Sequence, residues 1–179
     1  MKKYDQTDED VLEAEEGLDP SSNDVYPGIR FHRRKAMNTE KQFHEKLAAQ
    51  LTKHEGLRLK PYHCPAGKLT IGIGRNLEDK GITEKEAVML LENDIHECIE
   101  DLKTIFQGFD LLPEPARRVL VDMRFNLGPN RFRHFKKMIQ AVNEQNFIQA
   151  VAEMKDSRWY IQVGQRARTL VKMMTESDT

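Results

Sequence analysis

The first regular apolar pattern in the chain has a helical spacing. Apolar side chains recur every four residues from Phe43 to Leu51, which places one apolar stripe along a single helix face. Gly56 follows this pattern, and glycine is the residue that most often ends a helix. The pattern therefore predicts a helix over about residues 39–54, with Glu55 at its C-terminal end where the chain turns.

The next segment, residues 57–77, has a different pattern. β-Branched and alternating residues predominate, and turn-forming residues interrupt them at Pro65, Gly67, Gly72 and Gly74. This combination is typical of short antiparallel strands joined by tight turns. We expect two or three such strands, and no other part of the chain carries a comparable β pattern.

Helical spacing returns after this segment and continues to the end of the chain. Thr83 and Glu86 form a capping box that opens a long helix of about residues 83–107. Pro113 and Pro115 begin another helix through Leu127, which the sequence Gly128-Pro129-Asn130 should end. Further helices are expected over about residues 131–144, 147–155 and 163–175.

These elements predict an α+β fold that is mostly helical. A small lobe with an antiparallel sheet and a helical lobe would be joined by the long helix of about residues 83–107. A cleft between two lobes is a usual place for a binding site. Apolar residues make up 39% of the 179-residue chain, enough for one core of ordinary size.

Residues 1–38 form a polar N-terminal extension that we expect to be flexible, since they offer little apolar surface to offset the entropy of ordering. The domain itself should cover residues 39–179. Charge is uneven along the chain: residues 1–24 carry nine acidic and two basic side chains, whereas residues 115–172 carry twelve basic and four acidic ones. The net charge of −1 hides this basic region, whose field favours an anionic polymer such as cell wall or nucleic acid.

Several classes of protein are disfavoured by the sequence. The two cysteines, Cys64 and Cys98, have a spacing that suggests neither a disulfide framework nor a metal cluster, so we expect free thiols. The N-terminal residues lack the apolar stretch of a secretory signal, and no apolar run is long enough to span a bilayer. We therefore expect no membrane insertion, no metal and no cofactor.

One group of residues has a spacing that suits chemistry: Glu55, Cys64 after eight intervening residues, and Thr70 after five more. An antiparallel hairpin would bring the three together, because Glu55 ends a helix, Cys64 lies in the following turn and Thr70 lies on the next strand. His63 beside Cys64 suggests a Cys–His nucleophile, but neighbouring strand residues point to opposite faces. A metal site built from His54, His63 and Cys64 lacks a recognisable four-ligand pattern.

The sequence resembles the phage lysozyme family (glycoside hydrolase family 24). The resemblance rests on HEGLRLKPY from His54, TIGIG from Thr70, FNLG from Phe125, SRWY from Ser157 and QRAR from Gln165. It covers about residues 39–175, and the family uses a Glu, an Asp or Cys, and a Thr where this chain has its three candidates. The resemblance implies a muramidase that hydrolyses the β-1,4 bond between N-acetylmuramic acid and N-acetylglucosamine in peptidoglycan, with inversion.

Roles follow from this resemblance. Glu55 would protonate the leaving oxygen, while Thr70 and Cys64 would hold and orient the attacking water. A thiol with the reference pKa of about 8.5 is a weaker base than aspartate unless its pKa is lowered. The implied substrate-binding residues are Asn76, Phe125, Phe132 and Arg166, the last of which would pair with the catalytic Glu.

Two other functions stay open. A lytic transglycosylase also uses one Glu, and a non-catalytic wall-binding or virion module could retain the fold. The basic helices lack a recognisable nucleic-acid-binding motif, so we expect peptidoglycan and not nucleic acid as the partner. We expect a monomer that is made in the host bacterial cytoplasm and reaches the wall after membrane permeabilisation or as part of a phage particle.

Overall fold

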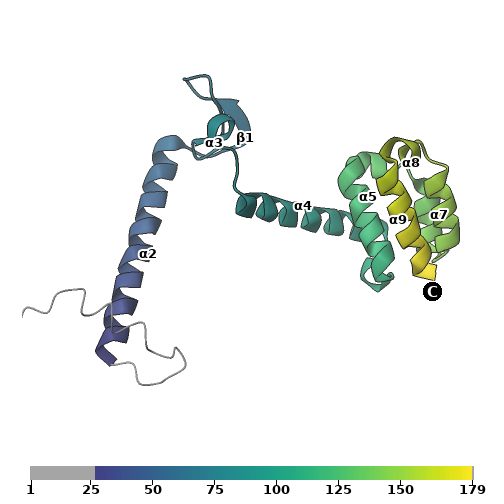
Figure 1. The fold of residues 1–179 in the computed structure, drawn as a ribbon, viewed down its shortest axis with the longest axis horizontal. Coiled ribbons are helices and arrows are strands. Elements are labelled where there is room, and N and C mark those ends of the chain that lie inside the picture. Colours follow the sequence, from purple (N-terminus) through teal and green to yellow (C-terminus); the bar gives the residue numbers. More distant parts are fainter. Residues whose placement is uncertain (1–26, 179) are drawn as a thin grey trace, which may run out of the picture. The chain divides into compact units, whose positions relative to one another are not determined.

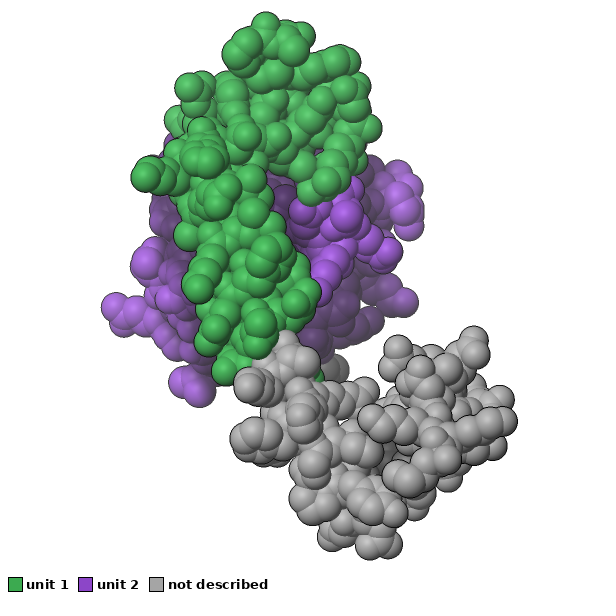
Figure 2. Space-filling model, turned by 90° about the vertical axis from the view of Figure 1, so that its left-hand side faces the viewer, with its two compact units in different colours: residues 1–81 green, residues 82–179 purple. Residues whose placement is uncertain are grey.

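The computed structural model describes the backbone of residues 27–178 and the side chains of residues 37–178. The chain divides into two compact units, residues 1–81 and residues 82–179, which are coloured separately in Figure 2. The fold is α+β and mostly helical, with one small antiparallel sheet, as the sequence predicts. The first 26 residues of the predicted extension lie outside the described part of the chain.

The helix that carries Glu55 is longer than predicted. Helix α2 spans Pro27–Glu55, so it begins twelve residues before the expected start at residue 39 (Figure 1). Pro27 suits the first position of this helix, where the N–H that proline lacks would have no hydrogen-bond partner. At the other end Gly56 has φ +73° and its N–H donates to the Thr52 carbonyl at 3.0 Å, which confirms the predicted stop.

The predicted strands form one three-stranded antiparallel sheet in the order β1-β2-β3. Strand β1 spans Arg58–His63, β2 spans Leu69–Gly72 and β3 spans Arg75–Asn76. A short helix, α3 (Leu77–Lys80), follows directly. The hairpin between β1 and β2 closes tightly, since the Cys64 N–H donates to the Lys68 carbonyl at 3.0 Å and the Gly67 N–H donates to the Cys64 carbonyl at 2.8 Å.

The second unit is helical. Its helices are α4 (Glu84–Ile105), η1 (Phe109–Leu111), α5 (Glu114–Phe132), α6 (Lys136–Asn143), α7 (Phe147–Lys155), α8 (Arg158–Val163), α9 (Gln165–Thr175) and η2 (Glu176–Asp178). In Figure 1 helices α5, α7, α8 and α9 lie together as a bundle at the C-terminal end of the chain, and direct contacts join α9 to α5, α7 and α8. Helix α8 was missed by the sequence analysis, and α6 begins five residues later than expected.

In this unit the predicted cap of α4 is confirmed, and the predicted end of α5 at Gly128 is a kink within the helix. Thr83 caps α4 by accepting a hydrogen bond from the Glu86 N–H at 3.2 Å, while the Glu86 carboxylate accepts one from the Thr83 N–H at 2.7 Å. Helical geometry also breaks at Gly128, where φ is +74° and ψ is +165°. One further turn follows this kink, so α5 ends at Phe132 and not at Leu127.

The second unit contains a continuous hydrophobic core. Leu102, Leu120 and Met123 have less than 2% of their surface exposed. Trp159 is 5% exposed, and its indole N–H donates to the Asn126 side-chain oxygen at 3.1 Å. A buried tryptophan needs such a partner for its N–H. Most of the stability from apolar burial therefore belongs to this unit.

An ionic network joins α4 to α5 within this unit. Asp101 accepts a hydrogen bond from the Arg124 Nε at 2.9 Å and is also bound by the Arg133 guanidinium. A second Arg124 nitrogen donates to Glu97 at 2.9 Å. Hydrogen bonding to Arg133, with a further contribution from Arg124, holds the pKa of Asp101 below its usual value, although burial opposes this shift.

Of the helices within residues 27–178, none combines the length and apolar character needed to cross a bilayer. Cys64 and Cys98 are both free thiols, as predicted.

Candidate functional site

A cavity of about 320 Å³ lies in the first unit and brings together four of the predicted site residues. Glu55, Cys64, Thr70 and Asn76 all line it. Glu55 comes from the end of α2, Cys64 from the hairpin turn, Thr70 from β2 and Asn76 from β3. The structure therefore brings Glu55, Cys64 and Thr70 to one cavity, as the hairpin argument predicted, and adds Asn76 to them.

The Glu55 carboxylate lies against a glycine. A methyl group added at Gly74 would lie 3.1 Å from Oε2 of Glu55 and 3.4 Å from its carboxyl carbon. Gly74 also has φ +70°, a conformation that favours glycine. A larger residue at this position would therefore require the Glu55 carboxylate to move by a few tenths of an ångström.

The Cys64 sulfur lies in a polar hairpin turn and is half-buried. Hydrogen bonds from the backbone at Lys68 and Ala66, and a smaller contribution from the Thr70 hydroxyl, lower the pKa of the Cys64 thiol. Burial opposes this shift. The lowered pKa favours the thiolate, which is a better base and hydrogen-bond acceptor than the neutral thiol.

Thr70 is the only buried side chain among the described side chains of the first unit, with 3% of its surface exposed. Its hydroxyl donates to the Lys68 carbonyl at 3.0 Å and also lies within hydrogen-bonding reach of Cys64. The hydroxyl has a single proton, so it donates to one of these two partners at a time. When it donates to Lys68, its oxygen lone pairs remain able to accept a hydrogen bond from a water molecule in the cavity.

Asn76 has a structural role at this site. Its side-chain oxygen accepts a hydrogen bond from the Asp79 N–H at 3.0 Å, which caps helix α3. Its side-chain nitrogen donates to the Asp79 carboxylate at 2.9 Å. Asn76 thus lines the cavity with a side chain whose orientation is already fixed by the cap.

The cavity also contains two side chains that the sequence analysis did not select, Arg58 and Tyr62. The Arg58 guanidinium carbon lies 4.3 Å from the centre of the Tyr62 ring, a cation–π contact. A sequence signal was present, because Tyr62 lies four positions after Arg58 and Cys64 two positions after Tyr62, the spacing of side chains on one strand face.

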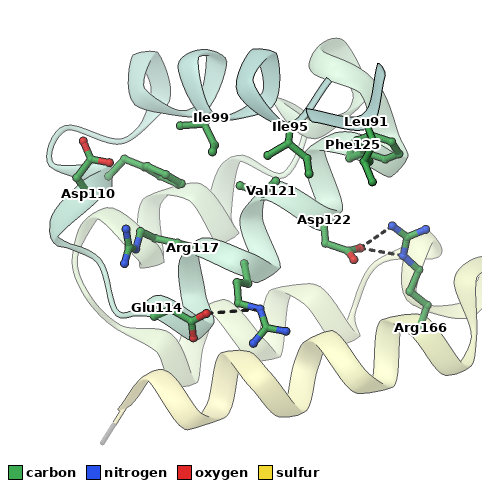
Figure 3. Close-up of a pocket in the computed structure, with 12 residues that line it drawn as sticks. Leu91, Ile95, Ile99, Asp110, Glu114, Arg117, Val121, Asp122, Phe125 and Arg166 are labelled. Carbon is green, nitrogen blue, oxygen red and sulfur yellow. Dashed lines mark hydrogen bonds and ion pairs between the residues drawn. The ribbon is translucent and has the colours of Figure 1, made fainter. Parts of the chain in front are cut away.

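The other predicted substrate-binding residues lie in the second unit. Phe125 and Arg166 line a separate cavity of about 580 Å³ between α4 and α5 (Figure 3). Phe125 is 44% exposed. The Arg166 Nε donates a hydrogen bond of 2.8 Å to Oδ1 of Asp122, and a second guanidinium nitrogen forms an ion pair with the same oxygen at 2.8 Å, so its partner in this unit is Asp122. Its predicted pairing with the catalytic Glu stays a prediction.

Phe132 requires a correction. Its side chain has no exposed surface, and its ring packs edge-on against Phe106 with the ring centres 6.4 Å apart. A side chain without accessible surface has no face to offer a sugar, so Phe132 belongs to the core and not to the substrate-binding residues. The sequence analysis missed this because an aromatic residue at helical spacing suits either position.

Within residues 37–178, no group of three or more His, Cys, Asp or Glu side chains is arranged to hold a metal ion. The side chains that line the Glu55 cavity offer carboxyl, thiol, hydroxyl, amide, phenol and guanidinium groups.

Comparison with known proteins gives an independent result. The family model described as phage lysozyme matches residues 52–175, which include Glu55, Cys64 and Thr70. The protein named probable T4-type lysozyme 2 of Dictyostelium discoideum is 24% identical over 157 residues, 71% of this chain and 92% of that protein.

Two phage proteins also match. The pre-baseplate central spike protein Gp5 of Enterobacteria phage T4 is 26% identical over 149 residues, which cover 68% of this chain and 26% of the phage protein. The peptidoglycan hydrolase gp36 of Pseudomonas phage phiKMV is 23% identical over 173 residues, which cover 92% of this chain and 19% of that protein. The similarity to both phage proteins is therefore confined to part of a longer chain.

Proposed function

The chain belongs to the phage lysozyme family, and on that premise we propose that it is a muramidase. Its reaction would be hydrolysis of the β-1,4 bond between N-acetylmuramic acid and N-acetylglucosamine in peptidoglycan. The observation that supports this proposal is the shared cavity of Glu55, Cys64 and Thr70. The phage relative named as a peptidoglycan hydrolase supports the same substrate.

Glu55 is the proposed general acid. A glycosidic oxygen is a poor leaving group, so it must receive a proton as the bond between the anomeric carbon and that oxygen breaks. Of the three proposed catalytic groups, a carboxylic acid is best suited to donate this proton. The close approach of Gly74 restricts where the Glu55 carboxyl group can lie, which favours a fixed position for the proton donor.

Thr70 and Cys64 are the proposed water-positioning residues. The attacking water would donate a hydrogen bond to the Thr70 oxygen, whose own proton is held by the Lys68 carbonyl. As the water oxygen bonds to the anomeric carbon, a water proton would pass to the Cys64 thiolate, whose formation the lowered pKa favours. Return of that proton to solvent and reprotonation of Glu55 complete the cycle, and attack from the opposite face gives inversion.

Product analysis distinguishes this proposal from its rivals. Purified peptidoglycan is incubated with the full chain, and the new sugar ends are identified by mass spectrometry. A muramidase produces reducing ends on N-acetylmuramic acid. Anhydro-muramic ends would instead identify a lytic transglycosylase, and the absence of cleavage where a control lysozyme works would favour a wall-binding module.

Two routes to the wall remain proposals: passage through a permeabilised membrane, and delivery in a phage particle. The similarity to a phage spike protein supports the second route. Detection of the chain by mass spectrometry in purified particles would support delivery by the virion, and its absence from them would favour passage through the membrane.

A further inference from the structure

The Glu55 cavity contains a cation that has no part in the proposed reaction. Arg58 lines this cavity, and the Tyr62 ring, on the same cavity, lies 4.3 Å from its guanidinium carbon. Protonation of the leaving oxygen and attack by water need neither side chain. The pair therefore invites an explanation in terms of substrate binding.

The strand geometry keeps Arg58 and Tyr62 on one face. In β1 Arg58 pairs with Gly72 and Tyr62 pairs with Thr70, so β1 has two more residues than β2 between these pairs. Because the number of extra residues is even, Arg58 and Tyr62 still point to the same face of the sheet. The irregular stretch contains Pro61, which has no N–H to donate to the neighbouring strand. Arg58 and Tyr62 therefore reach the same cavity as Thr70, which lies opposite Tyr62.

Arg58 differs from two other basic residues, Lys68 and Arg166, in having no counter-charge among the side chains of residues 37–178. Lys68 in the same unit is neutralised by Glu78 at 3.2 Å and by Asp79 at 3.0 Å. Arg166 in the second unit is held by Asp122. Among the acidic side chains that the structure describes, none forms an ion pair with Arg58, and this arginine is exposed.

A guanidinium that is oriented by an aromatic ring retains its N–H donors for a ligand. Stacking on Tyr62 restricts the Arg58 side chain, which lowers the entropy lost when it binds a partner. Its fork of N–H groups matches a carboxylate with two parallel hydrogen bonds. An uncharged sugar would not need such a group, whereas muramoyl residues carry carboxylates.

We propose that Arg58, oriented by the Tyr62 ring, binds a carboxylate of the substrate beside the scissile bond. This inference rests on the proposed function and adds a substrate-binding residue, Arg58, and a positioning residue, Tyr62. The carboxylate has two sources: the stem peptide attached to the muramoyl residue, or the lactyl group of a muramoyl residue that has lost its peptide.

The test compares Arg58→Gln with the wild type on three forms of the wall. The first is native peptidoglycan, the second has its carboxyl groups converted to methylamides, and the third has been stripped of stem peptides by an amidase. We expect Arg58→Gln to raise KM about tenfold on native wall with little change in kcat, as loss of one charge-assisted contact predicts. On methylamidated wall the wild type and the variant should have the same KM.

The third substrate identifies the source of the carboxylate. If Arg58→Gln raises KM on native wall but not on the stripped wall, the ligand is a stem-peptide carboxylate. If it raises KM on the stripped wall as well, Arg58 also binds the lactyl carboxylate, which becomes free only when the stem peptide is removed. An equal effect of Arg58→Gln on native and methylamidated wall would overturn the proposal, because the contact would then not depend on substrate charge.

Two further sets of variants test the role of the Tyr62 ring and the specific need for a cation at Arg58. Tyr62→Leu should raise KM about threefold on native wall, in keeping with a cation–π contact, and Tyr62→Phe should restore the wild-type value. Lys60→Gln removes a cation from the same strand that does not line the cavity, and we expect it to leave KM unchanged. An equal rise of KM in Lys60→Gln would overturn a specific role for Arg58.

A binding measurement on inactive variants distinguishes failure of this inference from failure of the proposed function. Sedimentation with native and methylamidated wall is measured for Glu55→Gln and for Glu55→Gln combined with Arg58→Gln. Weaker binding of the double variant to native wall only would support the inference even where no hydrolysis occurs. Equal binding of both variants to native wall would overturn it, whatever the product analysis shows.

Discussion

Residues 82–178 bury a continuous apolar cluster, whereas Thr70 alone is buried among the described side chains of residues 37–81. Yet the smaller unit contains the proposed acid, the thiol and the water-binding hydroxyl on one cavity. This difference between the units predicts that a substitution affects either the stability of the protein or its reaction, depending on the unit in which it lies. Changes in the second unit should act on stability, and changes around the Glu55 cavity should act on the reaction.

The largest expected effect on stability belongs to Phe132→Ala. Truncation of this fully buried ring should cost about 3–5 kcal/mol of unfolding free energy, through lost burial and the cavity left behind. Chemical denaturation measures the loss, and the activity of the folded fraction should stay close to that of the wild type. Phe125→Ala, at a 44% exposed position, is the matched control and should lose far less stability. Wild-type stability with a raised KM in Phe132→Ala would return this residue to the substrate-binding set.

Gly74→Ala should impair the reaction by displacing the Glu55 carboxylate. The new methyl group would lie 3.1 Å from Oε2, so we expect a fall in kcat of about thirtyfold, within the range that small misplacements of reacting groups produce. Steady-state kinetics on peptidoglycan provide the measurement.

Gly72→Ala is a close control for this prediction. Gly72 has φ +67° and nothing within 4 Å of an added methyl group, so it shares the backbone strain of Gly74→Ala without the contact. Gly72→Ala should lose comparable stability and retain activity. Equal kcat values in the two variants would contradict a role for Gly74 in positioning Glu55.

Asp101→Asn should destabilise the second unit by about 2 kcal/mol at neutral pH, because Arg124 and Arg133 lose a charged acceptor. The pKa of Asp101 is lower in the folded chain than in the unfolded chain. The Asp101 carboxylate therefore contributes its full share of the unfolding free energy above the ordinary aspartate pKa of about 3.9, and this share is lost as the pH falls through the lower folded value. Denaturation at pH 7 and at successively lower pH should show the two proteins converging below about pH 4. A difference that does not change with pH would contradict the ionic explanation.

Cys64→Ala is the smallest of the four effects, with an expected tenfold fall in kcat, about 1.4 kcal/mol in activation free energy. Alkylation with iodoacetamide gives a second measurement. The lowered pKa of Cys64 should make this thiol react at a lower pH than an ordinary cysteine, while the buried Cys98, whose thiol pKa is raised by burial, should stay unmodified in the folded chain. Unchanged kcat in both the variant and the alkylated protein would exclude Cys64 from the reaction.

The sequence was a good guide where a local pattern has one physical solution. The capping box of Thr83 and Glu86 predicted the start of α4, and the glycine after Glu55 predicted the end of α2. The hairpin was predictable because the alternating residues and the turn-forming residues indicate the same strands. It brings Glu55, Cys64 and Thr70 to one cavity.

The sequence was a poor guide where a residue has two compatible roles. Pro27 suits a turn or a first helical turn, and the structure uses it in the helix. Phe132 suits a cleft or a core, and tertiary packing places it in the core. Helix α8 is only six residues long, too short to show a helical period, although Ser157 caps it by accepting a hydrogen bond from Tyr160.

Arg58 was missed for a different reason. An arginine on a strand is ordinary for a solvent-exposed face, so the spacing of Arg58 and Tyr62 did not by itself single out this pair. Their stacking, and their places opposite Gly72 and Thr70, appear only in the structure. That none of the described acidic side chains pairs with Arg58 becomes apparent only when its surroundings are known.

The central claim is that the chemistry belongs to Glu55 and the stability to the second unit. It is tested most directly by measuring kcat on peptidoglycan and the free energy of unfolding for Glu55→Gln, beside Glu45→Gln on the same exposed helix as a control. We predict a fall in kcat of about a thousandfold for Glu55→Gln, as loss of a general acid implies, with unfolding free energies within about 0.5 kcal/mol of the wild type for both variants. A Glu55→Gln protein that cleaves peptidoglycan at the wild-type rate would contradict the account.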